Sequence, residues 1–183
     1  MPDDQPGLSF SARPFRIPGA DLPQVRFAHE VYYHPEQVGR KATIIGAGQI
    51  GMGTAVWLAK MDKQVSVVEL TGQIMGGRTV PPISDIEAVE LYIEKYHIGL
   101  CLHIKAVEIT PDHVLVEGVE DGEQFQIPAD TVLVCVGYQP VNSLYKQLLA
   151  ESRIPDLYSI GDSEHVANIY AAIHTAFEIA NSI

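Results

Sequence analysis

A glycine-rich segment that directly follows a strand-like run constrains the fold of this chain more than any other feature. The segment reads Thr43-Ile44-Ile45-Gly46-Ala47-Gly48-Gln49-Ile50-Gly51. The apolar run before the glycines favours a buried strand, and the apolar spacing over residues 50–61 favours a helix after them. A second strand-like run covers residues 64–70 and carries Glu69 near its end. This order predicts a strand, a tight turn, a helix and a parallel strand, which together form one unit of an α/β fold.

Each part of this unit suits one atom group of a dinucleotide. The first glycine permits the tight turn, the second lets the backbone approach a pyrophosphate, and the third lets the helix pack closely on the sheet. The N–H groups at the helix start favour phosphate through their partial positive charge. The residues predicted to bind the coenzyme here are Gly46, Ala47, Gly48, Gln49, Ile50 and Gly51. Glu69 is expected to accept hydrogen bonds from the two hydroxyls of the adenosine ribose.

The acid at position 69 favours NAD(H) over NADP(H), because a carboxylate would repel a 2′-phosphate. The residue just beyond it is Thr71 rather than an arginine, and the nearest cation in the sequence is Arg78. Two structural alternatives stay open at this point. The glycines could form a turn that binds no ligand, and Glu69 could be an exposed acid that ends a strand.

Charge, apolar runs and cysteine spacing limit the kinds of partner that the chain can bind and indicate its compartment. The net charge is −11 and the isoelectric point is about 4.9, which disfavours nucleic acid and anionic membranes as partners. No run approaches the roughly 20 apolar residues that span a bilayer. Cys101 and Cys135 both lie in apolar runs without metal-ligand or redox spacing. We therefore expect buried thiols, no metal site and a reducing, cytoplasmic location.

The remaining sequence predicts three regions. Residues 1–38 are rich in proline and should be extended, with disorder over 1–5 and a short strand and helix turn within 25–33. Residues 39–137 carry the regular α/β pattern, and the region 138–183 closes the chain. Within the second region, Ser84-Asp85-Ile86-Glu87 has the form of a capping box and predicts the start of a helix.

Beyond residue 70, the sequence predicts both helices and strands. A helix over 84–96 is followed by a strand over 100–104. Alternating patterns then predict an antiparallel meander and a return strand. These strands are expected over 106–109, 113–117, 124–127 and 131–136. A short helix over 145–149, a strand over 157–160 and an amphipathic helix over 168–183 complete the prediction.

These pieces together resemble the NAD-binding domain of two-dinucleotide flavoprotein reductases. Residues 131–142, Thr-Val-Leu-Val-Cys-Val-Gly-Tyr-Gln-Pro-Val-Asn, resemble the segment that leaves this domain. Residues 157–162, Leu-Tyr-Ser-Ile-Gly-Asp, resemble the second FAD motif, and residues 13–19 are similar to the segment that enters the NAD domain. The resemblance implies that Gly137 approaches the nicotinamide and that Asp162 binds the ribityl chain of FAD.

One branch of this superfamily shares a further motif. Residues 168–174, Asn-Ile-Tyr-Ala-Ala-Ile-His, are similar to a helix of the 2-enoate and 2,4-dienoyl-CoA reductases of the old-yellow-enzyme class. Full members of that branch begin with a TIM barrel that carries FMN and an iron–sulfur cluster, followed by an FAD domain that the NAD domain interrupts. The chain is therefore expected to be the C-terminal region of such a reductase, with FAD-domain remnants at 1–38 and 138–183 around an NAD-binding domain at 39–137.

The resemblance implies that the parent enzyme passes hydride from NADH to FAD and then reduces an activated C=C bond of an enoate or dienoyl-CoA. No catalytic acid, base or nucleophile is predicted within the chain, so it should be inactive alone. Gly53 departs from the pattern, since relatives commonly carry glutamate there, and Cys135 replaces an alanine. The alternatives are part of an NADH oxidase or ferredoxin-type reductase, and a non-catalytic nucleotide-sensing protein. Exposed apolar surface on the remnants would favour self-association.

Overall fold

The structure, a computed structural model, describes residues 12–14, 17–76, 81–151, 154 and 156–183. The chain divides into two compact units. The larger unit is formed by residues 16–137, and the smaller unit by residues 1–15 together with 138–183. Segments from both ends of the chain thus meet in the smaller unit.

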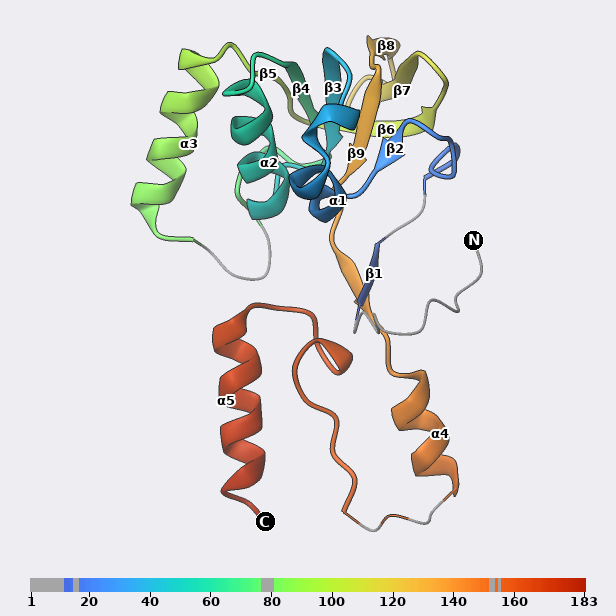
Figure 1. The fold of residues 1–183 in the computed structure, drawn as a ribbon, viewed down its shortest axis with the longest axis vertical. Coiled ribbons are helices and arrows are strands. Elements are labelled where there is room, and N and C mark those ends of the chain that lie inside the picture. The colour runs from blue at the N-terminus through green and yellow to red at the C-terminus, as the bar shows by residue number, and fades with distance from the viewer. Residues whose placement is uncertain (1–11, 15–16, 77–80, 152–153, 155) are drawn as a thin grey trace. The chain divides into compact units, whose positions relative to one another are not determined.

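A five-stranded parallel sheet forms the centre of the larger unit (Figure 1). Its strand order is β2-β9-β3-β4-β5, so the chain crosses over between sequential strands. The strands are β2 (Val25–Arg26), β3 (Lys41–Ile45), β4 (Gln64–Val68), β5 (Gly99–Cys101) and β9 (Thr131–Val134). Parallel pairing places the carboxyl ends of β3 and β4, and with them the glycine turn and Glu69, at the same edge of the sheet.

The two faces of this sheet bury two separate apolar clusters. Ile44, Val67 and Leu133 lie side by side in register and belong to the cluster beneath the helices. Ile45 and Val68 point the other way and belong to the cluster beneath the antiparallel meander. Burial on both faces explains why these strands are almost continuously apolar.

Helices cover one face of the sheet. They are α1 (Ala28–Tyr33), the 3₁₀ turn η1 (Pro35–Gln37), α2 (Gln49–Ala59) and α3 (Ile83–Lys95). Helix α2 supplies most of the helical core, with Met52, Ala55 and Leu58 fully buried. The burial of these side chains holds α2 against the sheet, so that its first turn lies directly after the glycine turn.

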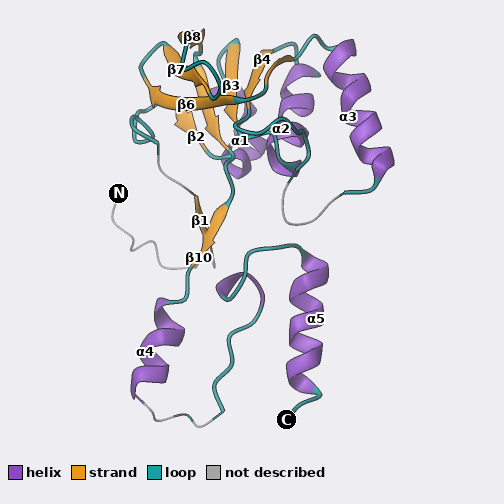
Figure 2. Cartoon of the chain, turned by 180° about the vertical axis from the view of Figure 1, so that it is seen from behind, coloured by secondary structure: helices purple, strands orange, loops and turns teal. Residues whose placement is uncertain are grey.

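A three-stranded antiparallel sheet covers the other face, as Figure 2 shows from behind. Its strands are β6 (Ile104–Ile109), β7 (His113–Gly118) and β8 (Gln124–Pro128). In β7 the buried residues alternate with half-buried ones, as expected for a strand with one face on a core. The predicted fold class, a Rossmann-like α/β domain with a parallel sheet and an antiparallel three-stranded meander, is confirmed.

The smaller unit contains β1 (Ala12–Pro14) paired antiparallel with β10 (Tyr138–Pro140). It also contains α4 (Ser143–Glu151), the 3₁₀ turn η2 (Gly161–Ser163) and α5 (Ile169–Ala180). Asn168 caps the start of α5, and its side chain accepts a hydrogen bond from the Ala171 N–H at 2.9 Å. Within the part of the smaller unit that the structure describes, none of these helices contains a buried residue.

Three local predictions are wrong. Helix α3 begins at Ile83 with Pro82 as its N-cap and no side-chain cap, so the predicted capping box is absent. The strand expected over 100–104 is divided, because His103 adopts a positive φ of 56° between β5 and β6. Residues 157–160 form no strand, since a strand needs a neighbour for its backbone groups and none is paired with them in the described residues.

Other expectations fall where nothing is described. The disorder expected over 1–5 lies outside the described residues, as does Arg78. Among the residues that are described, no helix is long and apolar enough to cross a membrane.

Candidate functional site

The turn after β3 has a geometry that requires glycine at two positions. Gly46 has a φ of 105°, and a Cβ atom added there would overlap the Cys135 carbonyl, whose carbon would lie 2.8 Å away. A Cβ on Gly51 would overlap the Gly46 carbonyl oxygen, and the carbonyl carbon would lie 3.0 Å away. The fold itself therefore explains these two glycines, as the predicted tight turn and close helix packing require.

Gly48 is different, because the fold does not require it. Its φ is −67°, and the nearest atom of the described residues to an added Cβ is the Gly76 carbonyl oxygen at 3.6 Å, an ordinary van der Waals distance. Among the described residues, a side chain there would make an ordinary contact with the Gly76 carbonyl and no clash. The lack of a side chain is explained if another molecule approaches the backbone at this point, as a pyrophosphate does in this type of turn.

The start of α2 presents N–H groups around Gly48. The first intrahelical bond runs from the Met52 N–H to the Gly48 carbonyl at 2.9 Å, so the N–H groups of Gln49, Ile50 and Gly51 precede it. Gln49 and Ile50 are exposed, whereas Ala47 is buried. Such a helix terminus is suited to an anionic group.

Glu69 lies beside this turn and is connected to it directly. Its Oε2 atom accepts a hydrogen bond from the Ala47 N–H at 2.7 Å. Its Oε1 atom accepts two bonds from Thr71, one from the N–H and one from the hydroxyl, both at 2.8 Å. The half-buried carboxylate is thus fixed at the carboxyl edge of the sheet, adjacent to the glycine turn.

The loop that follows Glu69, residues 69–76, is tied down at both ends. The Met75 N–H donates to the Ala47 carbonyl at 2.7 Å, and the Met75 side chain is buried. At the other end, the Ile104 N–H donates to the Glu69 carbonyl at 2.9 Å, and the His103 N–H donates to the Thr71 carbonyl at 3.2 Å. We call residues 69–76 the acid loop. Its backbone is hydrogen-bonded to the glycine turn at one end and to the start of β6 at the other.

The return strand β9 ends against the same turn. The Cys135 N–H donates to the Ile45 carbonyl at 2.7 Å, which places the Cys135 side chain next to Gly51. Burial raises the pKa of the Cys135 thiol to about 12, and it also raises the pKa of Cys101. Both thiols therefore stay protonated and unreactive at neutral pH.

Gly137 follows at the end of the larger unit. It has a φ of 93°, and an added Cβ would meet no atom of the described residues within 4 Å. The backbone conformation, rather than lack of space, favours glycine there.

Asp162, the predicted flavin ligand, lies in the smaller unit, within η2. Its Oδ1 atom accepts a hydrogen bond from the Ala167 N–H at 3.3 Å, which closes the segment before α5. The preceding Gly161 has a φ of 60°. The structure thus brings together seven of the predicted residues, 46–51 and 69, and leaves Asp162 in a separate unit.

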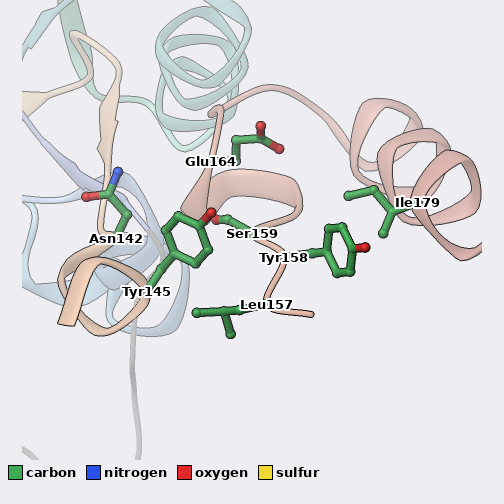
Figure 3. Close-up of a pocket in the computed structure, with 7 residues that line it drawn as sticks. All are labelled: Asn142, Tyr145, Leu157, Tyr158, Ser159, Glu164 and Ile179. Atoms are coloured by element: carbon green, nitrogen blue, oxygen red, sulfur yellow. The ribbon is translucent and has the colours of Figure 1, made fainter. Parts of the chain in front are cut away.

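A shallow pocket of about 220 Å³ in the smaller unit has no counterpart among the sequence predictions. Figure 3 shows the rings of Tyr145 and Tyr158 on either side of Ser159. Its lining residues are Asn142, Tyr145, Leu157, Tyr158, Ser159, Glu164 and Ile179. Leu157, Tyr158 and Ser159 lie in the segment that resembles the second FAD motif, and Asn142 ends the segment that resembles the exit from the NAD domain. The sequence pattern singled out these segments but predicted no pocket between them.

The role of Thr71 was also missed, although a signal was present. A threonine two residues after an acid is well placed for the local side-chain and backbone bonds that the structure shows. Among the described residues, no three histidine, cysteine, aspartate or glutamate side chains are grouped as metal ligands.

Residues 7–178 match a family model described as pyridine nucleotide-disulphide oxidoreductase. The chain is also 32% identical over 175 residues to a cinnamate reductase of Clostridium sporogenes, and 32% identical over 168 residues to a bilirubin reductase of Mediterraneibacter gnavus. These alignments cover 94% and 90% of this chain, but 25% of each relative. The chain thus spans about a quarter of the length of these curated relatives.

A solved structure has a similar fold. A complex of 2-naphthoyl-CoA reductase with 2-naphthoyl-CoA superposes with a TM-score of 0.79 at 27% identity, and the match covers 94% of this chain and 26% of that one. The predicted resemblance to the enoate and dienoyl-CoA reductase branch is confirmed by these similarities.

Proposed function

This chain belongs to the pyridine nucleotide-disulphide oxidoreductase family, and from that premise we propose that it is the NADH-binding module of a flavin-dependent reductase. In the parent protein, NADH would supply a hydride, FAD would receive it, and the electrons would reduce an activated C=C bond such as that of an enoate or an acyl-CoA. The names of the similar proteins support this reaction class, since one is a cinnamate reductase and another a 2-naphthoyl-CoA reductase. FMN and an iron–sulfur cluster would belong to the part of the parent beyond this chain.

The observation that carries the proposal is the contrast between Gly48 and its neighbours. Gly46 and Gly51 are explained by close contacts within the protein, whereas an added side chain at Gly48, at the start of α2, would clash with none of the described residues. Glu69 stands beside this turn, with its carboxylate held by Ala47 and Thr71. A site with an accessible backbone, exposed N–H groups and an adjacent acid fits the pyrophosphate and adenosine ribose of NADH.

The residues of this chain have binding and positioning roles in this proposal. The first turn of α2 would hold the pyrophosphate through N–H groups, and Glu69 would accept a ribose hydroxyl. Gly137 would lie near the nicotinamide, and Asp162 would face the flavin. Because hydride transfer depends on holding the two ring systems together, positioning is the contribution that the protein makes. The protein would act in the cytoplasm, where its two cysteines would stay reduced.

Energy transfer from Trp57 to NADH tests the proposal. Trp57 is the single tryptophan of the chain, and it lies on α2, about 12 Å along the axis from the start of that helix. Excitation of this residue should produce NADH emission that saturates at millimolar coenzyme. Glu69→Ala should weaken binding at least tenfold, because it removes hydrogen bonds made by a charged acceptor.

Glu108→Ala is the matched control for this experiment. It removes one carboxylate from an exposed position of β6 and should leave the titration unchanged. The proposal fails if the wild-type chain shows no saturable signal, or if the two variants bind NADH equally well.

A further inference from the structure

We propose that Thr71 is a positioning residue that fixes the Glu69 carboxylate and so sets the preference for NADH over NADPH. This inference rests on the coenzyme site proposed above and adds to it a residue that determines specificity. It starts from the three hydrogen bonds that surround one side chain.

Glu69 is held from two directions at once. Ala47, in the glycine turn, donates its N–H to Oε2 at 2.7 Å. Thr71, in the acid loop, donates both its N–H and its hydroxyl to Oε1 at 2.8 Å. Rotation of the carboxylate about its terminal bond would break bonds at both oxygens, so its orientation is fixed before any coenzyme arrives. Charge-assisted bonds of this kind are the stronger ones in proteins.

The bonds also determine what the carboxylate can still accept. An ionised carboxylate offers about four acceptor positions, and the described residues use three of them. The remaining position belongs to Oε2, the oxygen beside the glycine turn. Glu69 can therefore accept one ribose hydroxyl without losing an existing bond, where the sequence predicted two.

A fixed carboxylate discriminates more sharply than a mobile one. The 2′-phosphate of NADPH would bring negative charge against Glu69, and a free side chain would reduce the repulsion by turning away. The Thr71 hydroxyl resists that motion by holding Oε1. Thr71 thus acts on selectivity through Glu69, without contact to the coenzyme itself.

The bonds that hold the two ends of the acid loop do not involve the Thr71 side chain, whose contact within the loop beyond Glu69 is a long one of 3.5 Å from its hydroxyl to the Gln73 carbonyl. Thr71 is exposed, and its backbone carbonyl accepts a bond from the His103 N–H at 3.2 Å. The other end of the acid loop is fixed by the buried Met75 and its bond to Ala47. Removal of the hydroxyl should therefore loosen Glu69 while the loop keeps its path.

Two variants of the whole chain separate positioning from a general structural role. Thr71→Val keeps the shape and the N–H but lacks the hydroxyl, and Thr71→Ser keeps the hydroxyl. We expect Thr71→Val to bind NADH about threefold to tenfold more weakly and to bind NADPH at least as well as the wild type. The dissociation constant for NADPH divided by that for NADH should therefore be smaller in Thr71→Val than in the wild type. Thr71→Ser should restore the wild-type ratio.

The readouts are titrations with NADH and NADPH, each accompanied by a thermal melt. An unchanged ratio in Thr71→Val, an equal loss for both coenzymes, or a failure of Thr71→Ser to restore the ratio overturns the proposal. If the wild type binds NADH and Glu69→Ala does not, these outcomes reject the role of Thr71 and leave the coenzyme site standing. If the wild type binds neither coenzyme, both proposals fall.

Discussion

Two substitutions that each add one methyl group, Gly48→Ala and Gly51→Ala, should damage different properties of the protein. The positions are three residues apart in the same turn, and both are predicted to belong to the coenzyme site. Among the described residues, however, a Cβ at Gly48 meets nothing closer than 3.6 Å, whereas a Cβ at Gly51 overlaps the Gly46 carbonyl. Gly48→Ala should therefore damage binding alone, and Gly51→Ala should damage the fold.

The expected free energies follow from these contacts. At Gly51 the helix must move away from a backbone carbonyl, and overpacking of this kind costs about 1–3 kcal/mol or more of stability. At Gly48, alanine is a poorer N-cap than glycine by about 0.5–1 kcal/mol. A similar gain from the less flexible unfolded chain offsets that loss, so the net change should stay below about 1 kcal/mol. The methyl group would nevertheless stand between the backbone and the pyrophosphate and weaken NADH binding at least tenfold, or by about 1.4 kcal/mol.

Urea denaturation followed by circular dichroism gives the stability of each variant, and energy transfer from Trp57 gives its affinity for NADH. We expect Gly48→Ala to unfold near the wild-type midpoint and to bind weakly. The reasoning is refuted if Gly48→Ala binds NADH like the wild type, because the pyrophosphate would then not approach that backbone. It is also refuted if Gly51→Ala is as stable as Gly48→Ala.

Two further predictions concern the core around the site. Thr43 is fully buried in β3, and its hydroxyl has no hydrogen-bond partner among the described residues, so Thr43→Val should raise the free energy of unfolding by about 1–2 kcal/mol; a lower urea midpoint would contradict this. Because the folded-state pKa of Cys135 is raised to about 12, the folded protein keeps this proton while the unfolded thiol ionises above about pH 8.5. Stability should consequently fall as pH rises from about 9 toward 12, by up to about 1.4 kcal/mol per pH unit, and Cys135→Ala should flatten that slope in urea titrations at successive pH values.

The α/β architecture could be predicted because its signals are local and agree with one another. The apolar runs of β3 and β4, the glycines between them and the spacing of α2 all indicate the same unit, and the structure contains it. The alternation in β7 likewise indicates a strand with one buried face. Seven predicted site residues are brought together for the same reason, since parallel strands end at a common edge.

The errors occur where the outcome depends on tertiary partners. Residues 157–160 have a strand-like composition, but no neighbouring strand pairs with them in the described residues, and they stay irregular. The Ser84 motif has the form of a cap, yet the chain enters α3 one residue earlier through Pro82. The bonds between Thr71 and Glu69 depend on the path of the acid loop, which the sequence alone does not specify.

An NMR titration of the ¹⁵N-labelled chain with NADH tests the coenzyme site most directly. The account predicts that the largest amide shifts occur at residues 47–51, where the glycine turn leads into α2, and at Glu69 and Thr71 beside it. Shifts that saturate there and are lost in Gly48→Ala would support the account. Shifts confined to other parts of the chain, or no shifts at millimolar NADH, would contradict it.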